Sequence, residues 1–160
     1  MISHPIKEGI NGNPVIPGDK SISHRSIIIP SISNGVCEIN NILKSEDVLH
    51  TLNAFKSMGV LIEEEKEKIL IYGKGLNSLK KTKDSIYLGN SGTSARLLTG
   101  LLSSQKFDSI LTGDKSLTKR PMKRIADPLS RMNAKIHTTN GKLPLTIKGS
   151  NLIPSNIELE

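Results

Sequence analysis

A short pattern that occurs twice constrains the fold of this chain more than any other feature. The first copy spans residues 18–25 and reads GDKSISHR, and the second spans residues 89–96 and reads GNSGTSAR. A glycine, a serine and an arginine recur 71 residues apart in the two copies. Each copy is predicted to be a strand that runs through a turn of small residues into a helix. Free backbone N–H groups and the positive end of the helix dipole would then face one spot, which suits an anion.

The elements that follow each copy also repeat. Hydrophobic periodicity and turn residues predict, for the first unit, a strand at 14–16, a helix at 21–32, a strand at 36–42, a helix from 46 that ends at Gly59, and a hairpin of 60–64 and 69–72. The second unit repeats this order, with a strand at 85–88, a helix at 91–104, a strand at 109–112, a helix that begins at Pro121, and a hairpin of 134–138 and 143–147. We therefore predict an α/β fold of repeated β-α-β-α-β-β units that share one core.

These predictions divide the chain into parts. Residues 1–14 form a polar N-terminal segment, and 15–160 form a partial lobe. Within that lobe, unit one covers 15–74, a polar linker covers 75–84, and unit two covers 85–149. A strand at 156–160 is expected to start a third unit, which the sequence cuts off.

Composition narrows the class of partner. The chain has 160 residues, enough for one domain, with 22 Lys and Arg against 15 Asp and Glu and a formal net charge of +7. This balance favours anionic partners, either nucleic acid or small phosphorylated metabolites. Aromatic residues make up only 2%, so the stacking platforms of single-strand binders are lacking and nucleic acid is the weaker alternative. No signal peptide or membrane-length apolar run is evident, so we expect a cytoplasmic protein without a membrane partner.

Three side chains gather at the first predicted helix start. Ser21 and Arg25 lie one helical turn apart, so both could face one ligand, next to Lys20. A lysine supplies a point charge for phosphate or carboxylate, and an arginine supplies a bidentate fork. The alternative is that Ser21 only caps the helix and that the two cations are solvated.

The second helix start and the loop at 113–122 supply further candidates. Gly92 would let a ligand approach the backbone closely, with Thr93 beside it, although an ordinary helix start is the alternative. Arg96 could bind an anion as Arg25 would, but pairing with an acid inside its unit is the favoured interpretation. Arg120 precedes a proline and should therefore be extended, which would aim its guanidinium from a loop.

The remaining cations and the histidines are predicted to have no catalytic role. The cations of the third motif expected to be solvent-exposed are Lys115, Lys119, Lys123 and Arg124. The histidines have no metal-ligand spacing with cysteines or acids, and they are His4, His24, His50 and His137.

The motifs at 17–25 (PGDKSISHR), 88–93 (LGNSGT) and 113–122 (ending KRPM) closely resemble those of the 5-enolpyruvylshikimate-3-phosphate synthase family. The resemblance spans nearly the whole chain, and the three motifs are spaced as in that family. The related UDP-N-acetylglucosamine enolpyruvyl transferases share the fold but typically have Asn after the motif lysine, where this chain has Ser21. Such a transferase, or a basic anion-binding module, is the alternative.

The resemblance implies an inside-out α/β fold, in which each of two lobes holds three units with helices at the centre and sheets outside. The family is a transferase of the shikimate pathway, which leads to chorismate and the aromatic amino acids. It transfers the enolpyruvyl group of phosphoenolpyruvate to the 5-hydroxyl of shikimate 3-phosphate and releases phosphate, with no metal or organic cofactor. A full-length monomer is implied, with these two small molecules as its partners.

The resemblance also implies roles for individual residues. Lys20 would be the catalytic residue and contact both substrates. Ser21 and Arg25 would hold shikimate 3-phosphate. The residues that would bind phosphoenolpyruvate besides Lys20 are Asn90, Gly92, Thr93 and Arg120.

The length of the chain departs from the family pattern. It corresponds to an N-terminal portion, and the acidic residues that transfer protons in the family belong to the second lobe, with which residues 1–14 would pair. Because the reaction needs a proton donor and acceptor on either side of the substrate, the 160-residue chain is expected to be inactive alone. It could still retain weak affinity for shikimate 3-phosphate.

Overall fold

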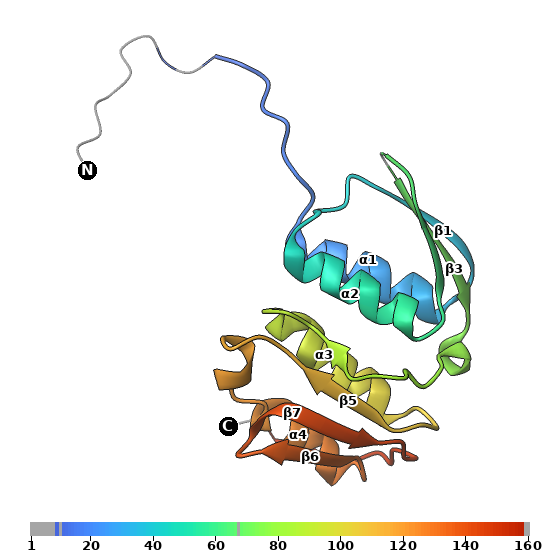
Figure 1. Ribbon diagram of the computed structural model, residues 1–160, viewed down its shortest axis with the longest axis vertical. Coiled ribbons are helices and arrows are strands. Elements are labelled where there is room, and N and C mark those ends of the chain that lie inside the picture. The colour runs from blue at the N-terminus through green and yellow to red at the C-terminus, as the bar shows by residue number, and fades with distance from the viewer. Residues whose placement is uncertain (1–8, 10, 67, 159–160) are drawn as a thin grey trace.

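Two successive α/β units build the protein, whose computed structural model describes residues 9, 11–66 and 68–158 (Figure 1). The first unit consists of α1 (Lys20–Ile32), β1 (Asn34–Asn40), α2 (Glu46–Ser57), β2 (Leu61–Glu64) and β3 (Lys68–Lys74). The second consists of β4 (Ile86–Tyr87), α3 (Gly92–Ser103), β5 (Ser109–Thr112), α4 (Lys123–Arg131), β6 (Lys135–Thr139) and β7 (Lys142–Lys148). Short 3₁₀ turns, η1 (Leu76–Ser78) and η2 (Leu117–Lys119), lie in the linker and before α4.

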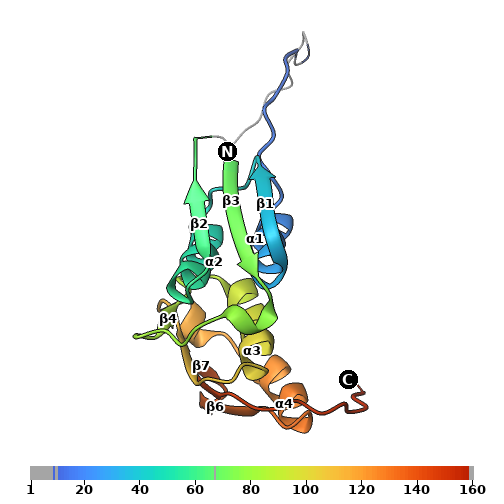
Figure 2. The same ribbon diagram turned by 90° about the vertical axis from the view of Figure 1, so that its right-hand side faces the viewer.

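The two sheets share a strand order. The first sheet runs β1-β3-β2 and the second β4-β5-β7-β6, so in both units the last strand lies between the two before it. Figure 2 shows β3 between β1 and β2. All pairs are antiparallel except β4 with β5, which is parallel. The predicted α/β fold and the repeated order of elements within the two units are thus confirmed, except for the strand at 14–16.

The strand predicted at 14–16 does not form. Residues 13–19 have no regular structure, and Val15 and Ile16 are 95% and 73% exposed. The equivalent strand of the second unit, β4, forms because it pairs with β5. In the first unit β1 is an edge strand that pairs only with β3 among the described strands, and residues 14–16 do not pair with its other edge.

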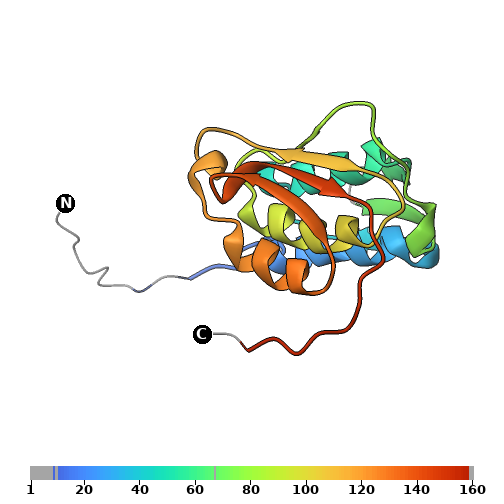
Figure 3. The same cartoon turned by 90° about the horizontal axis from the view of Figure 1, so that it is seen from below.

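Two other predicted boundaries are wrong. Pro121 does not begin α4, which starts at Lys123 after the N-cap Met122. Residues 156–158 are not a strand, while 159–160 lie outside the described residues. The stretch after β7 runs past α4 (Figure 3), where Ile153 N–H donates to the carbonyl of Met132 at 3.0 Å. Of the predicted N-terminal segment, residues 1–8 and 10 also lie outside the described part.

Two glycine positions show how the sequence permits these contacts. A Cβ on Gly73 of β3 would lie 2.1 Å from the carbonyl oxygen of Pro30, so only glycine lets β3 meet the end of α1. The β6–β7 hairpin turns at Asn140 and Gly141, which both have positive φ angles (54° and 72°). Asn-Gly is the pair that a two-residue turn of this hand favours.

One apolar cluster joins both units. It contains residues of α1, α2 and α3 and of both sheets, including the fully buried Ile27, Phe55, Leu98 and Leu145. The units therefore share a core, as predicted. Because α1 and α2 pack against each other and α1 also contacts α3, the helices are held in one orientation, and the chain enters all three from the same end (Figure 1).

Candidate anion-binding site

The N-termini of three helices converge at one end of the molecule. Lys20 of α1 forms an ion pair with Asp47 in the first turn of α2. The ring of His50, also on α2, lies against Gly89, just before α3: a Cβ there would be 2.3 Å from His50 Cδ2. The two predicted cradles are thus brought together, at the side where Figure 1 shows the starts of α1, α2 and α3.

The first cradle differs from the predicted helix-dipole site. Asp19 is the N-cap of α1, and its carboxylate accepts a hydrogen bond from Ile22 N–H at 2.7 Å. A carboxylate already occupies the positive end of this helix, so an anion must be attracted by side chains. Ser21 and Arg25 are exposed, and their side chains form no hydrogen bond or ion pair with any described residue.

The second cradle keeps the predicted form. Its N-cap is the neutral Ser91, whose hydroxyl accepts from Ser94 N–H at 3.2 Å, and the first turn of α3 has no acid. Arg120 Nη2 donates to Asn90 Oδ1 at 2.8 Å, which holds the guanidinium beside this helix start. An acid-free helix N-terminus with a fixed cation beside it is suited to a phosphate or carboxylate.

Gly92 makes this arrangement possible. A Cβ at this position would lie 2.8 Å from Arg120 Nη1 and 3.1 Å from Arg96 Nη1. Both guanidinium groups therefore approach the start of α3 only because residue 92 has no side chain. Thr93, the next residue, is exposed at the same helix start.

The predicted acid partner of Arg96 is wrong. Its Nη1 donates instead to the carbonyl of Gly92 in its own helix at 3.3 Å, and no ion pair with a described residue forms. Arg120 has the predicted extended backbone (φ −75°, ψ 139°). The four cations predicted to be solvent-exposed are so, namely Lys115, Lys119, Lys123 and Arg124.

The contacts of two groups at this site have no signal in the sequence. Asp47 is one, because nothing in the sequence joins this first-turn acid of α2 to a lysine 27 residues earlier. His24 is fully buried and contacts Thr51 and Ser94. Burial lowers the pKa of His24 below its ordinary 6.5. The negative charge of nearby Asp47 opposes this shift, and the positive charge of nearby Lys20 adds to it.

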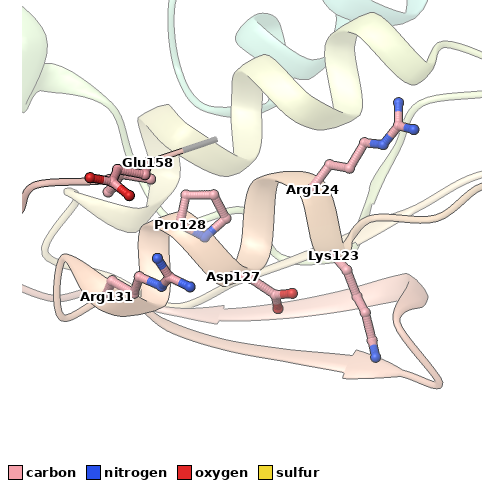
Figure 4. Close-up of a pocket in the computed structure, with 7 residues that line it drawn as sticks. Lys123, Arg124, Asp127, Pro128, Arg131 and Glu158 are labelled. Carbon is pink, nitrogen blue, oxygen red and sulfur yellow. The ribbon is translucent and has the colours of Figure 1, made fainter. Parts of the chain in front are cut away.

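A separate groove lies beside α4. It encloses about 860 Å³ and contains none of the predicted site residues. Figure 4 shows Arg131 and Asp127 on its α4 wall and Glu158 on the opposite segment. Its lining carries three cations (Lys123, Arg124 and Arg131) and two carboxylates (Asp127 and Glu158), so most of the positive charge is offset there.

Residues 9, 11–66 and 68–158 contain no cluster of three or more His, Cys, Asp or Glu that could hold a metal ion. Among the same residues, every helix is too short or too polar to span a lipid bilayer.

The fold and the converging helix starts define a mixed α/β protein of repeated units with cations gathered at one end. The chain belongs to the EPSP synthase (3-phosphoshikimate 1-carboxyvinyltransferase) family, whose sequence model matches residues 6–160. The predicted family resemblance is therefore confirmed.

Known relatives agree with this assignment. A 3-phosphoshikimate 1-carboxyvinyltransferase from Ruthia magnifica subsp. Calyptogena magnifica is 56% identical over 140 residues, which are 88% of this chain and 32% of the relative. One from Geobacter metallireducens is 52% identical over 91% of this chain and 34% of its own. The solved EPSP synthase of Acinetobacter baumannii matches with a TM-score of 0.83 and 52% identity, over 86% of this chain and 32% of that one. This chain thus spans about a third of the length of its relatives.

Proposed function

We propose that this chain supplies the substrate cradles of an enzyme that transfers the enolpyruvyl group of phosphoenolpyruvate to the 5-hydroxyl of shikimate 3-phosphate and releases phosphate. The observation that carries the proposal is Arg120, held by Asn90 beside the acid-free start of α3, at the end where Lys20 also lies. The relatives named above carry this activity in their names, over a chain three times as long.

The two cradles would take different anions. Phosphoenolpyruvate carries a carboxylate and a phosphate, which suit the helix N-terminus at Gly92 and Thr93 and the fork of Arg120. Shikimate 3-phosphate would be bound by Ser21 and Arg25, whose side chains are exposed at the start of α1. Lys20 would contact both substrates once an anion competes with Asp47 for its ammonium group.

The finer architecture is part of the proposal. An inside-out lobe would place a third unit against the helices that the two described units expose. Ile22 and Ile29 of α1 and Leu97 of α3 are 60%, 56% and 44% exposed, which supports an apolar covering of this kind. The full enzyme would be a cytoplasmic monomer without nucleic-acid or membrane partners. The 160-residue chain would bind substrate without turnover, since the proton-transfer groups lie elsewhere.

Calorimetry on the 160-residue chain tests this proposal. Arg25→Ala should weaken binding of shikimate 3-phosphate, and Arg120→Ala binding of phosphoenolpyruvate, each by tenfold or more, because a charge-assisted hydrogen bond contributes about 1.5–3 kcal/mol. Arg124→Ala is the matched control, an exposed arginine on α4 that should leave both affinities unchanged. Equal affinities for all three variants, or phosphate release by the chain with both substrates present, would contradict the proposal.

A further inference from the structure

A fully buried polar network connects the three converging helices. His24 Nδ1 of α1 lies 2.8 Å from Thr51 Oγ1 of α2, and Thr51 Oγ1 lies 2.5 Å from Ser94 Oγ of α3. Ser94 Oγ in turn lies 2.6 Å from Ser91 Oγ. All four side chains belong to residues no more than 1% exposed.

Hydrogen-bond capacity fixes a direction for this network. Ser91 Oγ already accepts from Ser94 N–H, so its own hydrogen is free to be donated to Ser94 Oγ. Ser94 then donates to Thr51, and Thr51 donates to the carbonyl of Asp47 at 3.3 Å or to His24 Nδ1. This order gives every hydroxyl hydrogen an acceptor, whereas the reverse order leaves the Ser91 hydrogen without one among the described residues.

The ends of the network are the two cradles. His24 belongs to α1, one residue before Arg25 and one helical turn after Lys20. Ser91 is the N-cap of α3, directly before Gly92. Between them, Thr51 bonds to the carbonyl of Asp47, the residue that pairs with Lys20. Buried polar groups must be paired to be tolerated, so these bonds restrict how α3 can sit against α1.

We propose that His24 is a positioning residue: through Thr51 and Ser94 it sets where the N-terminus of α3 lies relative to α1, and thereby the separation of the two cradles. An apolar side chain of similar size would fill the same space but would not orient the hydroxyls. The inference concerns geometry, and only its ligand measurement rests on the proposed function. His24 Nε2 is buried without a partner among the described residues, so Nδ1 is the atom that acts.

Two substitutions separate positioning from packing. Asn places a polar atom where His24 Nδ1 lies, so His24→Asn should keep the bond to Thr51. His24→Leu should lose it. Two-dimensional ¹⁵N NMR of the 160-residue chain should then show displaced Gly92 and Thr93 amide signals in His24→Leu and near-native signals in His24→Asn. His137→Leu, a histidine exposed on β6, is the matched control and should leave these amides unchanged.

A second variant tests the same path from its other end. Ser94→Ala should move the same amides as His24→Leu, and the double variant should add little, because both break one network. If His24→Leu folds poorly, Ser94→Ala alone still tests the network through the amide signals of Gly92 and Thr93. Unmoved Gly92 and Thr93 signals in Ser94→Ala and in the folded His24 variants would overturn the proposal, as would equal displacement by Leu and Asn.

The ligand measurement extends the test to binding. Phosphoenolpyruvate should bind the His24→Leu chain about tenfold more weakly than wild type, and the His24→Asn chain within about twofold, as expected for loss of one orienting bond. If wild type binds no phosphoenolpyruvate, the proposed function fails while the amide displacements still decide the positioning role. If wild type and both variants bind equally, His24 positions nothing that the ligand uses, and the proposal fails.

Discussion

The substitution Gly92→Ala should disturb ligand binding at the start of α3 while leaving the fold intact. The added Cβ would lie 2.8 Å from Arg120 Nη1, and an ordinary contact needs about 3.4 Å, so the guanidinium must retreat by about 0.6 Å. Arg120 is an exposed, long side chain that can move into solvent, and residue 92 has an ordinary helical backbone, so the cost to folding should stay within about 0.5 kcal/mol. The substitution should therefore change binding far more than stability.

This displacement of the Arg120 guanidinium should weaken phosphoenolpyruvate binding by about tenfold or more. It lengthens or breaks the 2.8 Å bond between Arg120 and Asn90, and it places a methyl group where the ligand approaches the start of α3. A displacement of about 1 Å at a substrate-positioning group can cost on the order of 100-fold. Calorimetry measures the affinity, and urea denaturation of the same samples measures the free energy of unfolding.

Gly100→Ala is the matched control on the same helix. Nothing lies within 4 Å of a Cβ at Gly100, so this variant should gain about 0.5–1 kcal/mol of stability and bind phosphoenolpyruvate as wild type does. If Gly92→Ala binds phosphoenolpyruvate as tightly as Gly100→Ala, or binds it weakly only because the chain has unfolded, then Gly92 does not provide the close approach to the start of α3.

Three further predictions follow from the contacts. Gly73→Ala should destabilise the chain by about 3 kcal/mol or more in urea denaturation, because its Cβ would lie 2.1 Å from the Pro30 carbonyl, and an unchanged midpoint would contradict that close approach. Asp47→Asn should lower the free energy of unfolding by no more than about 1 kcal/mol, since Lys20 is half-exposed. It should raise the affinity for inorganic phosphate about fivefold, because the Lys20 ammonium group is freed. A lower phosphate affinity would mean that Asp47 holds Lys20 in its binding position. Because burial lowers the pKa of His24 in the folded chain, the free energy of unfolding should fall as the pH drops below 6.5 and be insensitive to this residue above it. The charges near His24 that also affect its pKa are those of Asp47 and Lys20. His24→Asn cannot titrate at this position, so its free energy of unfolding should lack this fall with pH. A pH profile identical to that of wild type would contradict the prediction.

Much of the fold could be predicted because local signals agree with it. The Asn140–Gly141 turn, the alternating strand β7 and the acidic first turn of α2 each carry their structure in a few neighbouring residues. The strand at 14–16 had a local signal too, yet it did not form. A strand is stable only when its backbone groups find a partner, which local sequence does not report.

The candidate site was predictable in its residues but not in its chemistry. The repeated motif located both helix starts, and the Arg120–Pro121 sequence located an extended arginine. The Asp19 cap made the first cradle dependent on side chains, which distinguishes it from the second. His24 was predicted to have no catalytic role, and its buried contacts could not be predicted, because the hydroxyls around it come from helices 27 and 70 residues away.

The most direct test of the account maps where each anion binds. ¹⁵N NMR titration of the 160-residue chain with shikimate 3-phosphate should displace the amide signals of Ser21 and Arg25, and phosphoenolpyruvate should displace those of Gly92 and Thr93. If both anions leave these signals unmoved and instead displace the signals of residues that line the groove beside α4, the helix N-termini are not the anion-binding site.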